Sequence, residues 1–245
     1  MLLLSIPHFG IIMKKLSLAI LLSTLLSTTA FASDNVIDHS NHMPTKATTN
    51  LEASKTMMDD SMTAMSGMHS LKLTGDPDLD FIAGMLPHHE GAIVMSESIL
   101  PTLTDPAVHQ LAIDIVKSQQ QEVIYMKNWL ASHKELPQDK RDIANSEEMM
   151  TKSMKIMHNM MEVKLTGNPN IDFMAGMLPH HEAAVEMAEV IMPYLKDQST
   201  KTFAKNIIKA QLKEIAFMKK WLKEHAPAAQ KLIPAKDMTS SHNHH

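Results

Sequence analysis

The chain has 245 residues, 44% of them hydrophobic and 20% charged, and a formal net charge of −4. It contains 23 methionines and 15 histidines but no cysteine, which excludes disulfide scaffolds, zinc fingers, iron–sulfur clusters and cysteine nucleophiles. The acidic balance without a basic patch argues against nucleic-acid binding, and the chain has no glycine-rich loop of the kind that cradles phosphates.

The N-terminal segment is typical of a secretory signal. Lys14 and Lys15 precede an apolar run at 16–26, and Ala30 and Ala32 are the small residues of a cleavage site. We therefore expect cleavage near Ala32 and a periplasmic or secreted mature protein. The run is too short for a comfortable membrane span, which disfavours a retained anchor, and no other segment approaches a span.

The rest of the chain is a tandem repeat. Residues 80–90 return almost unchanged as 172–182, 92 residues later, and this register holds without a gap from 57–133 to 149–225. The predicted parts are a signal peptide at 1–32, a disordered lead at 33–50, helical repeats at 51–136 and 137–226, and a histidine-containing flexible tail at 227–245.

Each repeat is predicted to contain three helices and no strand. The first runs from about Leu51 to Leu73, and in the second repeat from Asp142 to Leu165, because Gly75 and its counterpart stop it. The second helix reaches about residue 100, and the third runs from about 105 to 133. We therefore predict an all-α fold, either two tandem antiparallel helical bundles of three to four helices each or one intertwined bundle.

The third helix places two polar residues on its inward face. Gln119 and Glu122, with Gln211 and Glu214 in the second repeat, share a stripe with apolar residues. A buried carboxylate is unfavourable unless it is paired, hydrogen-bonded or bound to a cation. These residues either receive hydrogen bonds from His89 or a helix end, or orient the ligands of a metal, and the two roles are compatible.

The second helix carries paired histidines among methionines. Met85, His88, His89 and Met95 cover one face, and Pro87 is predicted to kink the helix beside the pair. Their counterparts are Met177, His180, His181 and Met187. A lone histidine on an apolar face is usually part of the core, but paired and repeated histidines favour a metal site.

The first helix of each repeat is rich in methionine. The candidate ligands are Met58, Met62, Met65, Met150, Met154 and Met157. Methionine is often a core filler, but leucine packs as well and is common elsewhere in this chain. A thioether is a soft neutral ligand that suits Cu(I) and Ag(I), and imidazole also accepts Cu(II). The pattern therefore favours copper, with Cu(I) first and Ag(I) or Cu(II) as alternatives.

Enzyme signatures are missing from the chain. Di-iron bundles require Glu-x-x-His and zinc peptidases His-Glu-x-x-His, and neither occurs. The chain also has no Ser-His-Asp or comparable arrangement, so we expect a protein that is not an enzyme.

The motif Asp-Phe-x-Ala-Gly-Met-Leu-Pro-His-His-Glu, followed by Met95, Gln119, Glu122, Met126 and Trp129, resembles the CopM-like periplasmic copper-binding family. That family, formerly a domain of unknown function, consists of ferritin-like helical bundles, and the resemblance covers both repeats. It implies Cu(I) or Ag(I) binding and a role in copper tolerance. The ligands it implies are Met85, His88, His89, Met95, Met126, Met177, His180, His181, Met187 and Met218.

The predicted function is sequestration or delivery of copper through methionine and histidine sites. The expected partners are copper ions and a periplasmic copper exporter or chaperone, with no nucleic acid and no stable membrane span after processing. The alternatives are a methionine-rich helical adaptor or chaperone that binds apolar partners without metal, and a copper-dependent oxidase, for which the sequence gives no positive sign.

Overall fold

The computed structural model describes residues 46–133 and 143–226, which all belong to one compact unit, Met43–His245. The described residues do not include the predicted signal, most of the predicted lead, residues 134–142 between the repeats, or the histidine-containing tail. None of the helices within the two described ranges is long and apolar enough to cross a membrane.

The described residues are helical, which confirms the all-α prediction. The helices of the first repeat are α1 Lys46–Ala64, the short α2 Ser66–His69, α3 Pro77–Ile99, the 3₁₀ turn η1 Leu100–Thr102 and α4 Pro106–Ser132. Those of the second repeat are α5 Ile143–Met161, α6 Pro169–Ile191 and α7 Gln198–His225. Helix α3 continues through Pro87.

The first helices end earlier than predicted. The predicted ends at Leu73 and Leu165 are wrong, since α2 ends at His69 and α5 at Met161. The extended segment after α2 allows Leu71 and Leu73 to pack against the core. It also places the backbone N–H of Thr74 2.8 Å from a carboxylate oxygen of Asp80, and this bond requires a non-helical chain.

A buried carboxylate fixes the turn before each second helix. Asp80 accepts hydrogen bonds from Thr74 N, Thr74 Oγ1 and Gly75 N at 2.8, 2.9 and 2.9 Å. Gly75 has a φ of 81°, a conformation that glycine adopts without steric cost. Asp76 then caps α3, and Pro77 occupies its first turn. Thr166, Gly167, Asn168, Pro169 and Asp172 form the same arrangement before α6.

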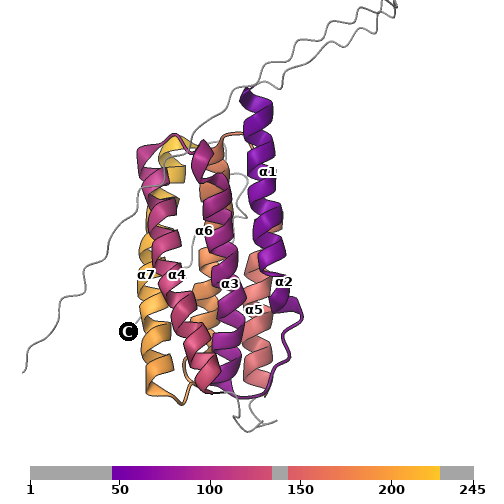
Figure 1. Ribbon diagram of the computed structural model, residues 1–245, viewed down its shortest axis with the longest axis vertical. Helices are drawn as coiled ribbons and strands as arrows, with labels where there is room; N and C mark the ends of the chain where they lie inside the picture. Colours follow the sequence, from indigo (N-terminus) through magenta and orange to yellow (C-terminus); the bar gives the residue numbers. More distant parts are fainter. Residues whose placement is uncertain (1–45, 134–142, 227–245) are drawn as a thin grey trace, which may run out of the picture. The chain divides into compact units, whose positions relative to one another are not determined.

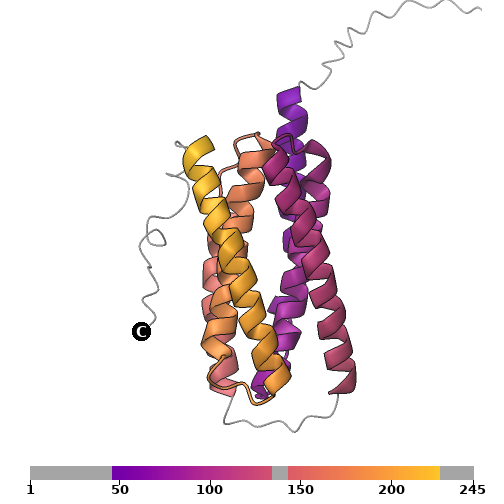
Figure 2. The ribbon, with the colours of Figure 1, turned by 90° about the vertical axis from the view of Figure 1, so that its left-hand side faces the viewer.

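The six long helices form three layers of two (Figures 1 and 2). Helices α3 and α6 are the middle layer and pack against each other. Helices α4 and α7 cover one side, with α4 on α3 and α7 on α6. On the other side α1 packs on α3 and α5 on α6, and Figure 1 shows α1 in the upper part of that side and α5 in the lower part.

The two repeats share their hydrophobic cores. One core joins Phe81 and Met126 of the first repeat to Met187 of the second. The other joins Met95 of the first repeat to Phe173 of the second. Neither repeat therefore has a core of its own, and the described residues form one intertwined unit.

Two reciprocal contacts hold the repeats together at the helix ends. The carboxylate of Asp78 accepts hydrogen bonds from the backbone N–H groups of Lys196, at 2.8 Å, and Asp197, at 3.2 Å. Asn170 is the counterpart of Asp78, and its Oδ1 accepts from Thr104 N at 3.1 Å and Asp105 N at 3.0 Å. The start of each second helix thus fixes the loop before the third helix of the other repeat.

Candidate metal centre

The four histidines of the predicted site lie in the middle layer and are completely buried. His88 and His89 come from α3, and His180 and His181 come from α6. The rings of His88 and His180 lie with their centroids 4.0 Å apart and their planes at 55°. The structure thus brings together histidines that are 92 residues apart in sequence, across the interface between the repeats.

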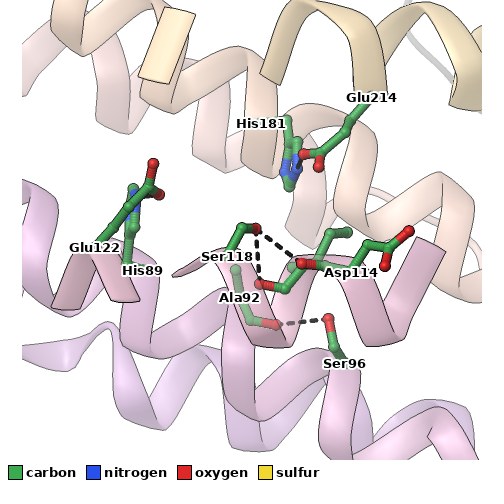
Figure 3. Close-up of polar contacts among 9 residues, drawn as sticks. His89, Ala92, Ser96, Asp114, Ser118, Glu122, His181 and Glu214 are labelled. Atoms are coloured by element: carbon green, nitrogen blue, oxygen red, sulfur yellow. Dashed lines mark hydrogen bonds and ion pairs between the residues drawn. The ribbon is translucent and has the colours of Figure 1, made fainter. Parts of the chain in front are cut away.

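The outer histidine of each pair is held by the inward glutamate of the third helix. His89 Nε2 lies 2.8 Å from a carboxylate oxygen of Glu122, and His181 Nε2 lies 2.7 Å from one of Glu214. Figure 3 shows each glutamate reaching its histidine from the neighbouring helix. Because a carboxylate only accepts, Nε2 carries a proton, and the neutral form of each ring has its lone pair on Nδ1. In both rings Nδ1 is buried without a partner among the described residues.

The prediction of a hydrogen bond from His89 is therefore confirmed for Glu122. Gln119 does not share this role, because its buried Oε1 has no hydrogen-bond partner in the described part of the chain. Both side-chain polar atoms of Gln211 are in the same situation. The inward stripe thus brings further unpartnered polar atoms into the bundle.

The inner histidines, His88 and His180, have no hydrogen-bond partner on either ring nitrogen within the described ranges. Burial lowers the pKa of both rings well below the usual value for histidine, and the neighbouring histidines lower it further. Both rings are therefore neutral at pH 7, and each has one nitrogen with a free lone pair. A buried polar atom without a partner costs about 1–3 kcal/mol, so these nitrogens favour a ligand that accepts their lone pairs.

Methionines from α1, α2 and α5 meet in a cavity of about 120 Å³ where the C-terminal ends of α1 and α5 approach each other. We call this the methionine pocket. Its lining residues are Met62, Met65, Met68, His69, Met154, Met157, His158 and Met161. Six thioethers and two imidazoles thus surround one small space.

Four of the eight lining residues were predicted as ligands, and the other four were not. His69, His158 and Met161 escaped because the repeats differ there, whereas Met68 was not chosen although its counterpart Met160 is also a methionine. His69 has Met161 as its counterpart, and His158 has Ser66, so comparison of the repeats did not select either histidine. Helical spacing was the available signal, since His158 lies four residues after Met154 on the same face.

Two further pairs of predicted methionines, each from one repeat, lie against a glycine of the other repeat. A Cβ atom on Gly176 would lie 2.6 Å from Met95 Cε and 3.0 Å from Met58 Sδ. A Cβ atom on Gly84 would lie 3.1 Å from Met150 Sδ and 3.7 Å from Met187 Sδ. Each glycine leaves room for two thioethers of the opposite repeat, one from its first helix and one from its second helix.

The remaining predicted methionines are fully buried in the shared cores. Met85 and Met126 belong to one core, and Met177 and Met218 belong to the other. Their thioethers fill space between helices, as methionine does in many cores.

The donor set determines what this centre can bind. No three His, Asp or Glu side chains of residues 46–133 and 143–226 converge closely enough to hold a metal on their own. The other potential ligands in this part of the bundle include the thioethers, which are soft and suit Cu(I) and related late metals.

Comparison with known proteins gives relatives of two kinds. The chain is 44% identical over 57 residues to the uncharacterized protein L153 of Acanthamoeba polyphaga mimivirus, which is 23% of this chain and 38% of that protein. It is similar to CopM in its Ag-bound form, with 28% identity over 61% of this chain and 96% of CopM and a TM-score of 0.47. For CopM in its Cu(I)-bound form the identity is 27%, the coverages are 60% and 96%, and the TM-score is 0.46.

A family model described as "Domain of unknown function (DUF305)" matches residues 25–130, 78–167 and 170–245. These matches span both repeats and most of the chain, so the chain belongs to the DUF305 family.

Proposed function

We propose that this protein binds Cu(I), and Ag(I) as its analogue, through mixed methionine and histidine ligands, and that it sequesters or delivers copper. The observation that carries the proposal is the methionine pocket, in which six thioethers and two imidazoles line one small cavity. Thioethers prefer soft monovalent metals, and unlike thiolates they need not lose a proton to bind.

The buried histidines support the same chemistry. Both nitrogens of His88 and His180 lack protein partners within the described chain, and burial holds both rings neutral by lowering the pKa. Because a metal binds the neutral imidazole, these rings are ready to act as ligands at neutral pH. A purely structural core would have little reason to bury four histidines with unpartnered ring nitrogens.

The setting of the proposed function is outside the cytoplasm. The signal predicted to be cleaved near Ala32 directs the chain to the periplasm or beyond, where a cysteine thiolate would oxidise readily. Methionine with histidine is a suitable copper-binding set in that compartment. The proposal includes a role in copper tolerance, a periplasmic copper exporter or chaperone as transfer partner, and no catalytic turnover.

Titration with Cu(I) against a chromophoric chelator tests the proposal. Replacing Met62, Met65, Met154 and Met157 together by leucine removes four thioethers while keeping apolar volume, at under about 1.5 kcal/mol per site. We expect this variant to fold and to lose most of its Cu(I) affinity. The control is Met174→Leu, a fully buried methionine outside the pocket, which should bind like the wild type. Wild-type protein that takes up no Cu(I) would overturn the proposal.

The histidines supply a second, independent test. Replacing His88, His89, His180 and His181 by alanine should weaken Cu(I) binding, whereas His109→Ala on α4 should not. Unchanged Cu(I) binding in the quadruple variant would contradict the proposal. Binding of an apolar protein partner that ignores copper and survives these changes would favour the adaptor function instead.

A further inference from the structure

The two repeats differ at one buried position beside the histidine pairs. Gly91 of α3 has Ala183 of α6 as its counterpart, and both are buried. Glycine inside a helix is destabilising relative to alanine, so its presence in the middle of α3 calls for a reason in the surroundings.

The surroundings of Gly91 show what the missing side chain makes room for. A Cβ atom at this position would lie 2.4 Å from Met65 Cγ, 3.1 Å from Met65 Sδ and 3.4 Å from His180 Nε2. Met65 therefore occupies the space that an alanine would need. Its sulfur and the imidazole nitrogen of the other repeat both lie within 3.4 Å of that one point, so the missing methyl group brings a thioether and an imidazole into the same small space. The thioether is flexible and can adjust its position toward a shared ligand.

Both donors are buried and suited to a ligand. Met65 is 3% exposed, His180 is fully buried, and the Nε2 of His180 has no hydrogen-bond partner in the described ranges. The ring of His88 lies against that of His180, with centroids 4.0 Å apart, and brings a second imidazole to the same place.

Ala183 prevents the same arrangement from forming around the corresponding position of the second repeat. The repeat relationship pairs Met65 with Met157, Gly91 with Ala183 and His180 with His88. At residue 183 the methyl group is present, so Met157 cannot take the position relative to α6 that Met65 takes relative to α3. Consistent with this, Met157 is 9% exposed.

We propose that the two repeats build one shared high-affinity soft-metal site rather than one site each, with Met65 Sδ and His180 Nε2 as ligands and His88 as the neighbouring imidazole. This inference rests on the proposed function and names the residues of its tightest site. Met65 also lines the methionine pocket, so the pocket is the access route from the surface. His69 and His158 are exposed at that pocket and would be the first to meet an incoming ion.

The test uses Ag(I), a soft probe without redox chemistry, and the full mature chain. Affinity and stoichiometry come from calorimetry with a competing ligand. NMR of ¹³C-methyl-labelled methionine identifies the thioether that binds first. We expect one tightest site per chain, with the Met65 methyl signal shifting before the others. Gly91→Ala should weaken this site by about 10- to 100-fold, the range seen when the support of a metal ligand is lost.

Two controls separate this effect from general disturbance. Gly67→Ala adds a methyl group near the same helices, but its Cβ would meet Pro87 Cβ at an ordinary 3.5 Å, so Ag(I) affinity should not change. Ala183→Gly should leave the tightest site intact. If Gly91→Ala fails to fold, as judged by circular dichroism, Met65→Leu must produce the same loss, because it keeps the volume and removes the sulfur.

The outcomes distinguish the two proposals. Wild-type protein that binds no Ag(I) would overturn the proposed function itself. Wild-type protein that binds two ions equally, or a folded Gly91→Ala variant that binds as tightly as the wild type, would overturn the shared site while leaving soft-metal binding intact. An Ag(I)-induced shift of Met157 before Met65 would also overturn it.

Discussion

Two neighbouring polar pairs between α3 and α4, a histidine with a glutamate and a lysine with a glutamate, offer a test of how burial sets interaction strength. His89 and Glu122 approach to 2.8 Å, with side-chain exposures of 0% and 23%. Glu90 and Lys127 also approach to 2.8 Å, but are 39% and 57% exposed. We expect a double-mutant cycle to give a coupling energy of about 1.5–3 kcal/mol for the buried pair, because a charge-assisted hydrogen bond shielded from water is strong. The exposed pair should give about 0.2–1 kcal/mol.

The cycle needs urea unfolding of metal-free protein at pH 7.5. The buried cycle combines His89→Phe with Glu122→Ala, and the exposed cycle combines Glu90→Ala with Lys127→Ala. Glu122→Ala alone should be the most harmful of the single carboxylate changes, because it leaves His89 buried with no partner on either ring nitrogen. Equal coupling energies in the two cycles, or a harmless Glu122→Ala, would refute the assignment of Glu122 as the residue that holds the imidazole.

Further predictions concern stability. Asp78→Asn should preserve the contact between the repeats and should not lower the free energy of unfolding at pH 7. The reasons are that Asn170 makes the same contact as an amide and that burial raises the pKa of Asp78. Asp78→Ala should lower the free energy of unfolding, measured with urea, by about 1–3 kcal/mol. Asp80→Asn should cost about 2 kcal/mol or more, because an amide cannot accept all three hydrogen bonds, and a thermal melt unchanged from the wild type would contradict this. His88 and His180 have a folded-state pKa below the unfolded value near 6.5, so the unfolded chain binds more protons below that pH. The free energy of unfolding of the metal-free protein should therefore fall on acidification below about pH 6.5, by at most about 1.4 kcal/mol per group and pH unit. Equal free energies of unfolding at pH 7.5 and 5.5 would argue against neutral buried rings.

Much of this arrangement could be predicted because the sequence contains each helix twice. Agreement between the repeats identified the inward stripe of the third helix, and the bond between Glu122 and His89 follows from it. Helix termini were predictable where a local signal acts, as at Asp105, which caps α4. The end of the first helix was predicted too late, because the segment before Gly75 is extended and bonds through Thr74 to the carboxylate of Asp80.

Sequence periodicity could not predict the contacts between the repeats. Periodicity shows which face of a helix is buried, but not which helix covers it. The tilted contact between the rings of His88 and His180 depends on α3 and α6 packing together in the middle layer, and so does the approach of His180 to Gly91. Comparison of the repeats can even mislead at such places, since Gly91 matters because its counterpart differs.

Departures from an ideal core occur in all three layers of the described bundle, and those on the side of α1 and α5 involve methionine and serine. Among the described residues, the inward faces of α1 and α5 combine methionines with the fully buried serines Ser54, Ser61, Ser146 and Ser153, whose hydroxyls have no assigned partner. The other helices add phenylalanine, isoleucine and tryptophan to the shared cores, together with further methionines. Leucine at the methionine and serine positions would bury more apolar surface and leave fewer polar atoms unsatisfied. Local departures of this kind are expected at functional sites, so the methionines and serines of α1 and α5 agree with the soft-metal site that we propose at the methionine pocket.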